Sequence, residues 1–436
     1  MTYEQTIDHL YSQLPMFSRI GAAAYKKDLH NTVQLCEAIG NPHRKFKSIH
    51  IAGTNGKGST ASMLAAVLQE AGYKTGLYTS PHIKDFRERI RINGEMIDKN
   101  FIVDFVERTK KLTEDIQPSF FELTVAMAFE YFAKEKVDIA VIETGLGGRL
   151  DSTNVISPIL SVITNIGFDH VQILGNTLPE IAFEKAGIIK KNTAVVIGET
   201  LPETLQVFLK KAQEETAAVH LASEEFIVEY IDASGDLLLC NVRNVSTNVV
   251  EKLRLDLTGL YQTKNICTVL SAIGVLKELG IAISESNIHH GLENASAITG
   301  IKGRWQVLET KPALILDVAH NEDGIKQILI QLRHSYPSST YHFVLGFVND
   351  KDVDKVLSLF PVNAKYYFTN AHIPRALPAT ELQKAASEKL LEGKAFDDVN
   401  DAVKEARLQA MAQDVIMVCG SFFIIAEIES TVSLSH

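Results

Sequence analysis

The segment Ile49-His50-Ile51-Ala52-Gly53-Thr54-Asn55-Gly56-Lys57-Gly58-Ser59-Thr60 decides the fold of the first part of this chain. Its first four residues have the apolar character of a strand, and apolar residues after Thr60 recur at helical spacing. A strand, a glycine-rich turn and a helix together hold the phosphates of a nucleotide, because the turn amides and the helix dipole attract anions. Lys57 adds a positive charge, and a Ser or Thr hydroxyl can coordinate Mg²⁺.

This segment departs from the strict phosphate-loop pattern G-x-x-x-x-G-K-[ST], because Gly58 stands between Lys57 and Ser59. A glycine-rich turn can also be a plain tight connection between a strand and a helix. Lys57, the hydroxyls of Ser59 and Thr60, and the flanking strand and helix together favour a phosphate site over a plain turn.

The length of the chain predicts two domains. It has 436 residues, which exceeds the roughly 250–300 at which a single hydrophobic core stops growing. Hydrophobic residues make up 46% of it and charged residues 22%, as in ordinary soluble globular proteins. The net charge of −10 disfavours nonspecific binding to nucleic acid, so local basic groups would have to attract any anionic substrate.

The sequence predicts no membrane segment. Its first five residues contain neither the basic nor the apolar segment of a signal peptide. The apolar run 415–428 is interrupted by Gly420, Ser421 and Glu427, and it is shorter than the ~20 residues that span a bilayer. The cysteines lack zinc-site spacing and are predicted to be buried thiols of a reducing cytoplasm. They are Cys36, Cys240, Cys267 and Cys419. We therefore expect a cytoplasmic protein with no membrane or nucleic-acid partner.

Two apolar segments after the phosphate loop predict buried parallel strands. Residues 137–142 are too apolar on both faces for an edge strand. Glu143 follows at the carboxyl end, where open α/β sheets place ligand-binding groups. A carboxylate there can orient Mg²⁺, and the alternative is a Glu that caps the surface. Residues 159–166 form the second strand, and His170 beyond it is a candidate metal or phosphate contact unless it is structural.

Residues 89–97 predict a β-hairpin, because Ile and Arg alternate and Asn93-Gly94 fits a type I′ turn. A basic cluster leads into this hairpin. It consists of His82, Lys84, Arg87, Arg89 and Arg91. The cluster can meet an acidic substrate, or it can be a solvated face that Asp85 and Glu88 neutralise. The sequence leaves both readings open.

The alternation of strands and helices restarts in the last third of the chain. Before it, residues 224–257 contain short alternating segments that predict a small antiparallel patch, and residues 296–299 are predicted as a linker. The predicted strands beyond the linker are 313–317, 341–348, 365–369 and 414–419. Alternating with helices, they predict a second doubly wound parallel sheet. This part has no phosphate loop, and its polar groups follow a strand in Asp317-Val318-Ala319-His320-Asn321. We expect a lid that closes over the site of the first domain, which would then lie in the cleft between them.

With these motifs in place, the chain resembles the folylpolyglutamate synthase and dihydrofolate synthase family, within the Mur ligase superfamily. The resemblance covers nearly the whole chain and rests on several motifs in the same order. They are Gly53 to Thr60, Thr79-Ser80-Pro81-His82, Glu143-Thr144-Gly145-Leu146-Gly147-Gly148-Arg149-Leu150-Asp151, Asp169-His170, Glu184-Lys185-Ala186-Gly187, Tyr261-Gln262 with Asn265, Gly303-Arg304, and Asp317-Val318-Ala319-His320-Asn321. The resemblance implies an α/β protein with an ATP-binding domain at 1–295, a linker at 296–299, and a Rossmann-like glutamate-ligase domain at 300–436.

The resemblance also implies an ATP-dependent amide ligase. ATP would phosphorylate a carboxylate of the substrate to an acyl phosphate, because a free carboxylate is a poor electrophile, and the amine of L-glutamate would attack it. Catalytic roles would fall to Lys57, His170, Lys185, Asp317 and His320. The residues that would hold ATP are Gly53, Thr54, Asn55, Gly56, Lys57, Gly58, Ser59, Thr60, Asn265, Arg304 and Asp317.

Two Mg²⁺ sites are implied in the same way. Their ligands would be Ser59, Ser80, Glu143, His170 and Lys185. Lys185 matches the family's carbamylated lysine, whose added carboxylate can bind the second Mg²⁺. The sequence pattern alone makes Lys185 only an exposed lysine on a helix.

The substrate contacts are less fixed across this family. His82 and Arg87, in the loop after Ser80, are candidates, and so are Phe120 and Phe121, for which core packing is the alternative. One departure is Lys302, where the family usually has Pro before Gly-Arg. We expect this change to alter the linker more than the chemistry, although it bears on the pose of Arg304.

Three functions remain open at this point. The first is a γ-glutamyl ligase that acts on folates, and the second is dihydrofolate synthase activity on dihydropteroate, alone or combined with the first. The third is a binding module without ligase activity, in which ATP only closes the domains. The substrates would be L-glutamate, ATP and a folate or dihydropteroate, and we expect a monomer.

Overall fold

The computed structural model describes residues 1–16, 19, 21, 26, 28–233, 235–349 and 352–429. The chain divides into two compact units, Met1–Ile301 and Lys302–His436. The residues predicted as a linker, 296–299, lie in the first unit, in helix α13 (Ala295–Thr299). They are helical because Ala295 and Ile298 pack into the hydrophobic core of that unit.

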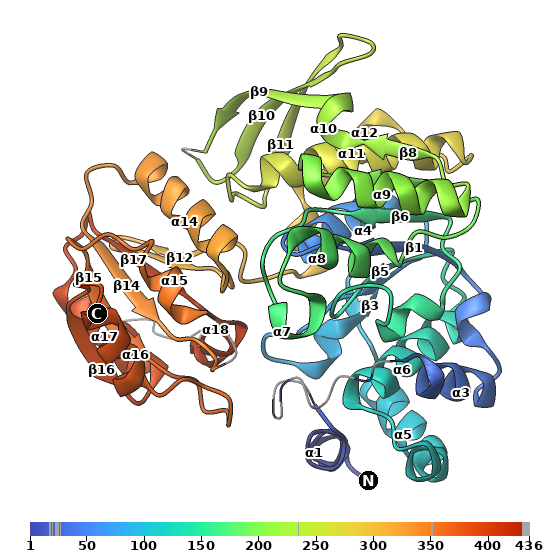
Figure 1. The fold of residues 1–436 in the computed structure, drawn as a ribbon, viewed down its shortest axis with the longest axis horizontal. Coiled ribbons are helices and arrows are strands. Elements are labelled where there is room, and N and C mark those ends of the chain that lie inside the picture. Colours follow the sequence, from blue (N-terminus) through green and yellow to red (C-terminus); the bar gives the residue numbers. More distant parts are fainter. Residues whose placement is uncertain are drawn as a thin grey trace. The chain divides into compact units, whose positions relative to one another are not determined.

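An eight-stranded sheet forms the centre of the first unit, in the order β4-β3-β2-β5-β1-β6-β7-β8 (Figure 1). Its strands are β1 (Lys47–Ala52), β2 (Thr75–Tyr78), β3 (Ile90–Ile92), β4 (Glu95–Met96), β5 (Ile139–Glu143), β6 (Leu160–Ile163), β7 (Val195–Ile197) and β8 (Val219–Leu221). All pairs from β2 to β8 are parallel, whereas β3 and β4 pair antiparallel at one edge. The phosphate loop follows β1, so the carboxyl ends of β5 and β6 flank it.

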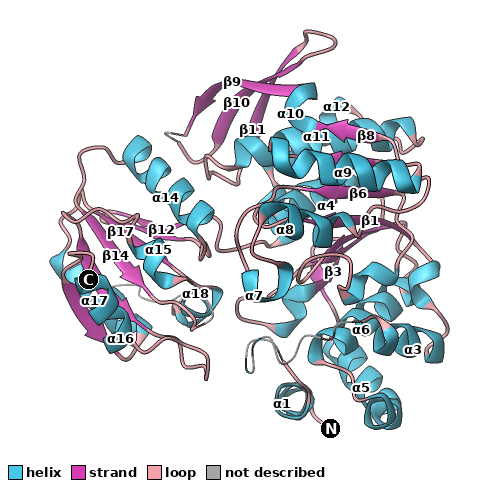
Figure 2. Ribbon diagram, in the orientation of Figure 1, coloured by secondary structure: helices cyan, strands magenta, loops and turns pink. Residues whose placement is uncertain are grey.

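Helices cover both faces of this sheet (Figure 2). The described helices of the first unit are α1 (Tyr3–Gln13), α3 (His30–Ala38), η2 (Pro42–Arg44), α4 (Lys57–Glu70), η3 (Phe86–Arg89), α5 (Lys99–Ile116), α6 (Phe120–Lys134), η4 (Ser152–Val155), α7 (Val171–Leu174), α8 (Leu178–Ala186), α9 (Pro202–Glu215), α10 (Ala222–Glu225), α11 (Gln262–Glu278), α12 (Glu285–Glu293) and α13. Because side chains alternate between the faces of a strand, Ile49 and Ile51 of β1 pack with α4 and α11, whereas Ala52 packs with α8 and α9. Helix α4 is buried on all sides from Gly58 to Leu68, which places the first turn after the phosphate loop inside the unit.

A three-stranded antiparallel sheet completes the first unit, as the sequence predicts for residues 224–257. Its strands are β9 (Phe226–Asp232), β10 (Leu238–Asn244) and β11 (Val250–Leu255), in the order β11-β10-β9. Leu238, Cys240 and Val242 alternate with more exposed residues and pack, with the other side chains of that face, into the core that contains α11 and α12. This alternation is what fixes the face of the sheet that turns inward.

The second unit contains a six-stranded sheet in the order β12-β13-β17-β14-β15-β16. Its strands are β12 (Gln306–Thr310), β13 (Ala313–Leu316), β14 (Tyr341–Leu345), β15 (Lys365–Thr369), β16 (Gly393–Phe396) and β17 (Val415–Cys419), and its helices are α14 (Glu322–Ser335), α15 (Val353–Leu357), α16 (Ala379–Ser387), α17 (Val399–Gln409) and α18 (Phe422–Glu427). Only the β12–β13 pair is antiparallel. This architecture confirms the predicted fold class of two α/β sheets, each parallel for the most part.

Local predictions hold where the sequence signal is strong. The hairpin of β3 and β4 turns at Asn93 and Gly94, whose φ angles of 48° and 79° have the positive sign that a type I′ turn requires. Three strands were missed, β8, β12 and β16, because each has only three to five residues and no buried, alternating pattern. Such segments gain their strand structure from pairing with β7, β13 and β15 rather than from their own pattern.

The four cysteines are buried and free, as predicted. Burial raises the pKa of the Cys36 and Cys240 thiols to about 12 and that of Cys267 to about 11, and it also raises the pKa of Cys419. Among the described residues, none of the helices combines the length and the apolar character that crossing a membrane requires.

Candidate active site

The predicted phosphate loop connects the central strand β1 to the buried helix α4. Gly56 caps the helix with a φ of 82°, and Lys57 is its first residue. The amides of a first helical turn have no acceptor within the helix, and the helix dipole makes this end positive. The start of α4 is therefore suited to an anion, and phosphate binding by this loop stays a prediction.

The segment after β6 holds this loop by hydrogen bonds. The amides of Thr54 and Asn55 donate to the backbone oxygen and to Oδ1 of Asn165, at 3.0 and 2.8 Å. Oγ1 of Thr164 donates to the carbonyl oxygen of Asn55 at 2.6 Å, and Oγ1 of Thr54 exchanges hydrogen bonds with the backbone of Gly167. These contacts occupy the amides of Thr54 and Asn55. A phosphate bound to this conformation would therefore have to meet the amides of the part of the loop that enters α4.

Two glycines of the loop are required by close contacts. A Cβ atom at Gly53 would lie 1.8 Å from Oγ1 of Thr164, and one at Gly56 would lie 2.3 Å from Oδ1 of Asn265. Asn265 was predicted to hold ATP, and the structure places it against the loop. Its Nδ2 donates to Gln262 at 2.7 Å, and Nε2 of Gln262 donates to Oγ of Ser59 at 3.2 Å. The first turns of α11 thus fix Ser59 through Gln262.

Replacement of Gly56 by alanine tests this packing. Gly56→Ala is expected to lower the free energy of unfolding by about 2–4 kcal/mol, because a positive φ and a clash with Asn265 add up. Gly72→Ala is the matched control, since Gly72 has a φ of 85° and nothing within 4 Å of an added Cβ. It should cost only about 1–2 kcal/mol. If urea unfolding showed the same loss of unfolding free energy in Gly56→Ala and Gly72→Ala, Asn265 would not pack tightly on the loop.

Two lysines converge on one carbonyl oxygen of the loop. Nζ of Lys57 donates to the oxygens of Gly53 and Thr54 at 3.0 and 3.1 Å, and Nζ of Lys185 donates to the oxygen of Gly53 at 2.8 Å. Lys185 is 3% exposed, which corrects the reading of an exposed helix lysine, because the C-terminal turn of α8 packs under the loop. Burial, together with the charge of Lys57, lowers the pKa of Lys185 to about 7.

Glu143 ends β5 beside the phosphate loop. Its neighbour in the register is Ile51 of β1, it is 4% exposed, and its Oε2 accepts the amide of Ser80 at 3.1 Å. The structure therefore joins two of the predicted metal ligands, at the carboxyl edge of the sheet. His170 is the N-cap residue of α7 and has a φ of 50°. Its amide donates to Oδ1 of Asp169, and its Nε2 lies 3.8 Å from the same oxygen.

The residues present fit a hard cation such as Mg²⁺ in part. Glu143, Ser59 and Ser80 supply the oxygen ligands that Mg²⁺ prefers, whereas the imidazole of His170 suits softer transition metals better. Within the described parts of the chain, no group of three or more His, Cys, Asp and Glu side chains could hold a metal ion. Mg²⁺ does not need such a cage, because it keeps several waters and binds through one or two carboxylates and substrate phosphates.

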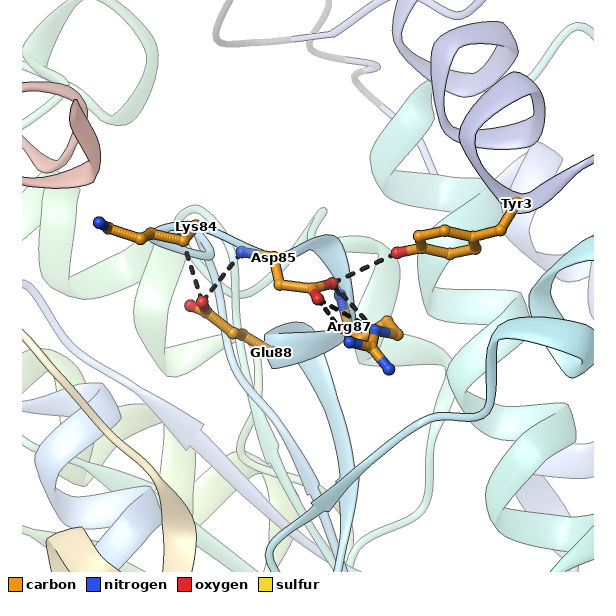
Figure 3. Close-up of polar contacts among 5 residues, drawn as sticks. All are labelled: Tyr3, Lys84, Asp85, Arg87 and Glu88. Carbon is orange, nitrogen blue, oxygen red and sulfur yellow. Dashed lines mark hydrogen bonds and ion pairs between the residues drawn. The ribbon is translucent and has the colours of Figure 1, made fainter. Parts of the chain in front are cut away.

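The loop after Ser80 is fixed by its own acidic residues. Figure 3 shows the carboxylate of Asp85 between the hydroxyl of Tyr3 and the guanidinium of Arg87, at 3.3 and 2.7 Å. The carboxylate of Glu88 accepts the amides of Ile83, Lys84 and Asp85 at 2.8–3.1 Å. Arg87, a predicted substrate contact, is thus paired with Asp85. This pairing agrees with the alternative interpretation, in which Asp85 and Glu88 neutralise the basic residues.

Arg89 and His82 do not belong to a solvated face. Arg89 is 8% exposed, and its Nε donates to Nδ1 of His82 at 2.7 Å. His82 therefore carries its proton on Nε2, which lies 3.1 Å from the hydroxyl of Tyr11. Burial and the charge of Arg89 lower the pKa of His82 to about 3, so the imidazole stays neutral.

The two predicted aromatic contacts differ in their surroundings. Phe120 is 3% exposed and packs against Tyr11 and Phe86, with the guanidinium of Arg89 5.3 Å from its ring centre. Phe121 is partly buried under Gly145, where a Cβ atom would lie 2.5 Å from its ring. The structure therefore shows the core packing that the sequence offered as the alternative for both rings. Their contact with a substrate stays a prediction.

The predicted residues of the second unit lie together at the end of β13. Both carboxylate oxygens of Asp317 accept backbone amides, from Trp305 at 2.8 Å and from Ala319 at 2.9 Å. This carboxylate therefore fixes the turn that carries Arg304. The ring centre of Phe422 lies 5.2 Å from the guanidinium of Arg304 and 6.0 Å from the ring centre of His320.

Several of these residues were given no role from the sequence. Thr164, Asn165 and Gln262 hold the phosphate loop, and Phe422 lies between Arg304 and His320. Thr164 and Asn165 directly follow a buried strand, so the rule that singled out Glu143 could have found them. Phe422 gave no comparable signal, because an aromatic residue after a strand is ordinarily part of a core.

Comparisons with known proteins cover the candidate residues of both units. Residues 51–273 match the Mur ligase middle domain, and residues 303–422 match the Mur ligase glutamate ligase domain. The chain is 35% identical over 416 residues to the dihydrofolate synthase/folylpolyglutamate synthase of Bacillus subtilis, which covers 92% of this chain and 94% of that protein. It is 32% identical over 443 residues to the folylpolyglutamate synthase of Lacticaseibacillus casei, with 99% of each chain covered.

Solved structures are similar in fold over the same length. Mycobacterium tuberculosis folylpolyglutamate synthase, complexed with ADP and AMPPCP, has a TM-score of 0.86 at 31% identity and covers 98% of this chain and 97% of its own. Escherichia coli FolC, in complex with DHPP and ADP, has a TM-score of 0.85 at 28% identity and covers 98% and 96%. The bifunctional folylpolyglutamate synthase/dihydrofolate synthase of Yersinia pestis, complexed with AMPPNP and Mn ion, has a TM-score of 0.82 at 28% identity and covers 98% and 97%.

Proposed function

This chain belongs to the Mur ligase family, among its folylpolyglutamate and dihydrofolate synthases, and from that membership we propose that it joins L-glutamate to the γ-carboxylate of a folate at the expense of ATP. Support comes from the likeness to such ligases over nearly the full length. The observation that carries the proposal within the chain is Lys185, buried against the phosphate loop and in contact with the same carbonyl oxygen as Lys57. A plain nucleotide switch has no need of this second lysine.

The reaction is proposed to run in two displacements. A carboxylate oxygen of the folate attacks the γ-phosphorus of ATP, the bond to the β-phosphate oxygen breaks, and an acyl phosphate and ADP result. The amine nitrogen of glutamate then attacks the acyl carbon, phosphate leaves, and the nitrogen loses a proton to give the amide. Lys57 and the first-turn amides of α4 would hold the phosphates and oppose the negative charge on their oxygens during the phosphoryl transfer.

Divalent metal is part of this proposal. Glu143, Ser59 and Ser80 would hold one Mg²⁺, and His170 with a carbamylated Lys185 would serve a second one. When bound, the metal neutralises phosphate charge and orients the phosphates. The residues of the chain keep these ligands in place, because Gln262 fixes Ser59 and the amide of Ser80 binds Glu143.

Carbamylation of Lys185 is proposed on chemical grounds. The uncharged amine attacks CO₂, forms a nitrogen–carbon bond and releases a proton, so a lysine with a pKa near 7 reacts more readily than an ordinary one. The carbamate nitrogen keeps one N–H, and therefore the hydrogen bond to Gly53 can persist. The side chain would change from a cation to an anion next to the phosphate loop.

The second unit is proposed to contribute to nucleotide binding. Asp317 positions Arg304 through the backbone of Trp305, and His320 donates from Nδ1 to the carbonyl of Val318 at 2.8 Å. This hydrogen bond orients the imidazole of His320. Phe422 lies beside the side chains of Arg304 and His320.

An assay of glutamate-dependent ADP release separates the candidate functions. Glutamate-dependent release with tetrahydrofolate as acceptor but not with dihydropteroate would indicate a folylpolyglutamate synthase. Release with both acceptors would indicate a bifunctional enzyme. The second function is kept because the B. subtilis relative is named for both activities. We expect release with at least one of the two acceptors. ADP binding without any glutamate-dependent release would contradict the ligase proposal and favour the nucleotide-gated binding module.

A further inference from the structure

The ends of three neighbouring strands are linked in series toward the phosphate loop. In the sheet β1 lies next to β6 and β6 next to β7. Asn165, after β6, accepts the amides of Thr54 and Asn55 in the loop after β1. Glu199, after β7, in turn holds the segment after β6, because its amide donates to the oxygen of Thr164 at 2.9 Å and its Oε1 accepts Nδ2 of Asn165 at 3.2 Å.

This contact sets the direction of the Asn165 amide. The side chain of Asn165 can accept through Oδ1 and donate through Nδ2. The amide of Asn55 needs an acceptor, and the carboxylate of Glu199 offers only acceptors. Both needs are met only when Oδ1 faces Asn55 and Nδ2 faces Glu199. A carboxylate at 199 therefore excludes the reversed amide, which would direct Nδ2 at the N–H of Asn55.

Helix α11 secures the outer end of this series. Nζ of Lys264 donates to Oε2 of Glu199 at 2.6 Å. The same helix carries Asn265 against Gly56 and Gln262 on Ser59. One turn of α11 thus supports the loop on one side directly and on the other side through Glu199 and Asn165.

We propose that Glu199 is a positioning residue of the nucleotide site, which acts through the amide of Asn165 to hold the phosphate loop in its binding shape. The inference rests on the proposed function only in that the loop binds a nucleotide, and it does not depend on the acceptor that is glutamylated. Glu199 touches neither ATP nor the reacting atoms in this role.

Glu199 and Lys264 are too exposed for their ion pair to be a major source of stability. Their side chains are 35% and 48% exposed, and ion pairs between such groups contribute little to folding. Loss of Glu199 should therefore change nucleotide affinity while the melting temperature hardly moves. A merely structural role would give the reverse.

The test measures the dissociation constant of ADP in the full chain by titration calorimetry. Glu199→Gln should weaken ADP binding several-fold, because glutamine can face Asn165 with either end of its amide. Asn165→Asp places two carboxylates in contact and should weaken ADP binding by roughly tenfold or more. The double variant Asn165→Asp/Glu199→Gln restores one donor and one acceptor, so it should regain most of the affinity that Asn165→Asp loses.

Glu203→Gln is the matched control, because Glu203 is an exposed carboxylate in the first turn of α9. The Glu203→Gln variant should bind ADP with the same affinity as the wild type. In the ligase assay, Glu199→Gln should raise KM for ATP and leave KM for glutamate unchanged.

Two results would overturn the positioning role. One is an unchanged ADP affinity in Glu199→Gln, and the other is a double variant that binds ADP no better than Asn165→Asp. If Asn165→Asp does not fold, Glu199→Gln alone still decides, since its site is partly exposed. A wild-type chain that binds ADP but ligates no glutamate would refute the proposed ligase function and leave this test intact.

Discussion

Lys57→Ala is expected to lower glutamate-dependent ADP release by about 100- to 1,000-fold or more, the range seen when one preorganised donor to a transition state is removed. Nζ of Lys57 reaches back over the loop to the oxygens of Gly53 and Thr54, so its charge is held where the helix dipole of α4 already favours an anion. The developing charge on the transferred phosphoryl group would lose this partner. The measurement is the initial rate of ADP release with saturating acceptor and glutamate.

The fold should survive this change. Lys57 is only partly buried, and the loop keeps its contacts with Thr164 and Asn165. The melting temperature should stay close to that of the wild type, and Lys210→Ala, at an exposed lysine of α9, should retain full activity. Near-normal ADP release by Lys57→Ala in a folded protein would mean that the phosphate loop is wrongly assigned.

The second large effect is expected for Lys185→Ala, which should reduce turnover by about 100-fold or more. This variant removes the group that would become the carbamate next to the phosphate loop. A short carboxylic acid such as formate or acetate can enter the space that the side chain leaves and supply the missing carboxylate. We therefore expect that added acid restores part of the activity of Lys185→Ala and none of that of Lys57→Ala.

Lys190 offers the matched control for this rescue. Its Nζ also donates to a backbone oxygen, that of Asn154 at 2.9 Å, and burial also lowers its pKa. Lys190→Ala should lose some stability but show no response to formate. Unchanged kinetics in Lys185→Ala would rule out the carbamate, and a rescue that is equal in both variants would show that the acid acts elsewhere.

The parts of the site that the sequence could predict share one property, which is that their signal is local. The phosphate loop, Glu143 at the end of β5 and the turn at Asn93-Gly94 are each contained in a few consecutive residues. The second sheet was predictable for the same reason, because alternating strands and helices repeat along the chain.

The contacts that hold the site together were not predictable in this way. Asn165 meets Asn55 across 110 residues, and Gln262 meets Ser59 across 203. Such pairs depend on the order of strands in the sheet and on the packing of α11, which no short pattern encodes. Lys185 shows the same limit most clearly. Its helix pattern suggests exposure, and only the fold of the loop over α8 buries it.

The buried thiols have a practical consequence for the study of this enzyme. Cysteine reacts with maleimide dyes as the thiolate, and a buried thiol with a raised pKa supplies very little of it. The native chain therefore gives a low background for labelling without removal of its own cysteines. Cysteines introduced at Lys210 in the first unit and at Lys404 in the second can carry a donor and an acceptor dye. Energy transfer between them would then report in solution how far apart the two units are with and without nucleotide.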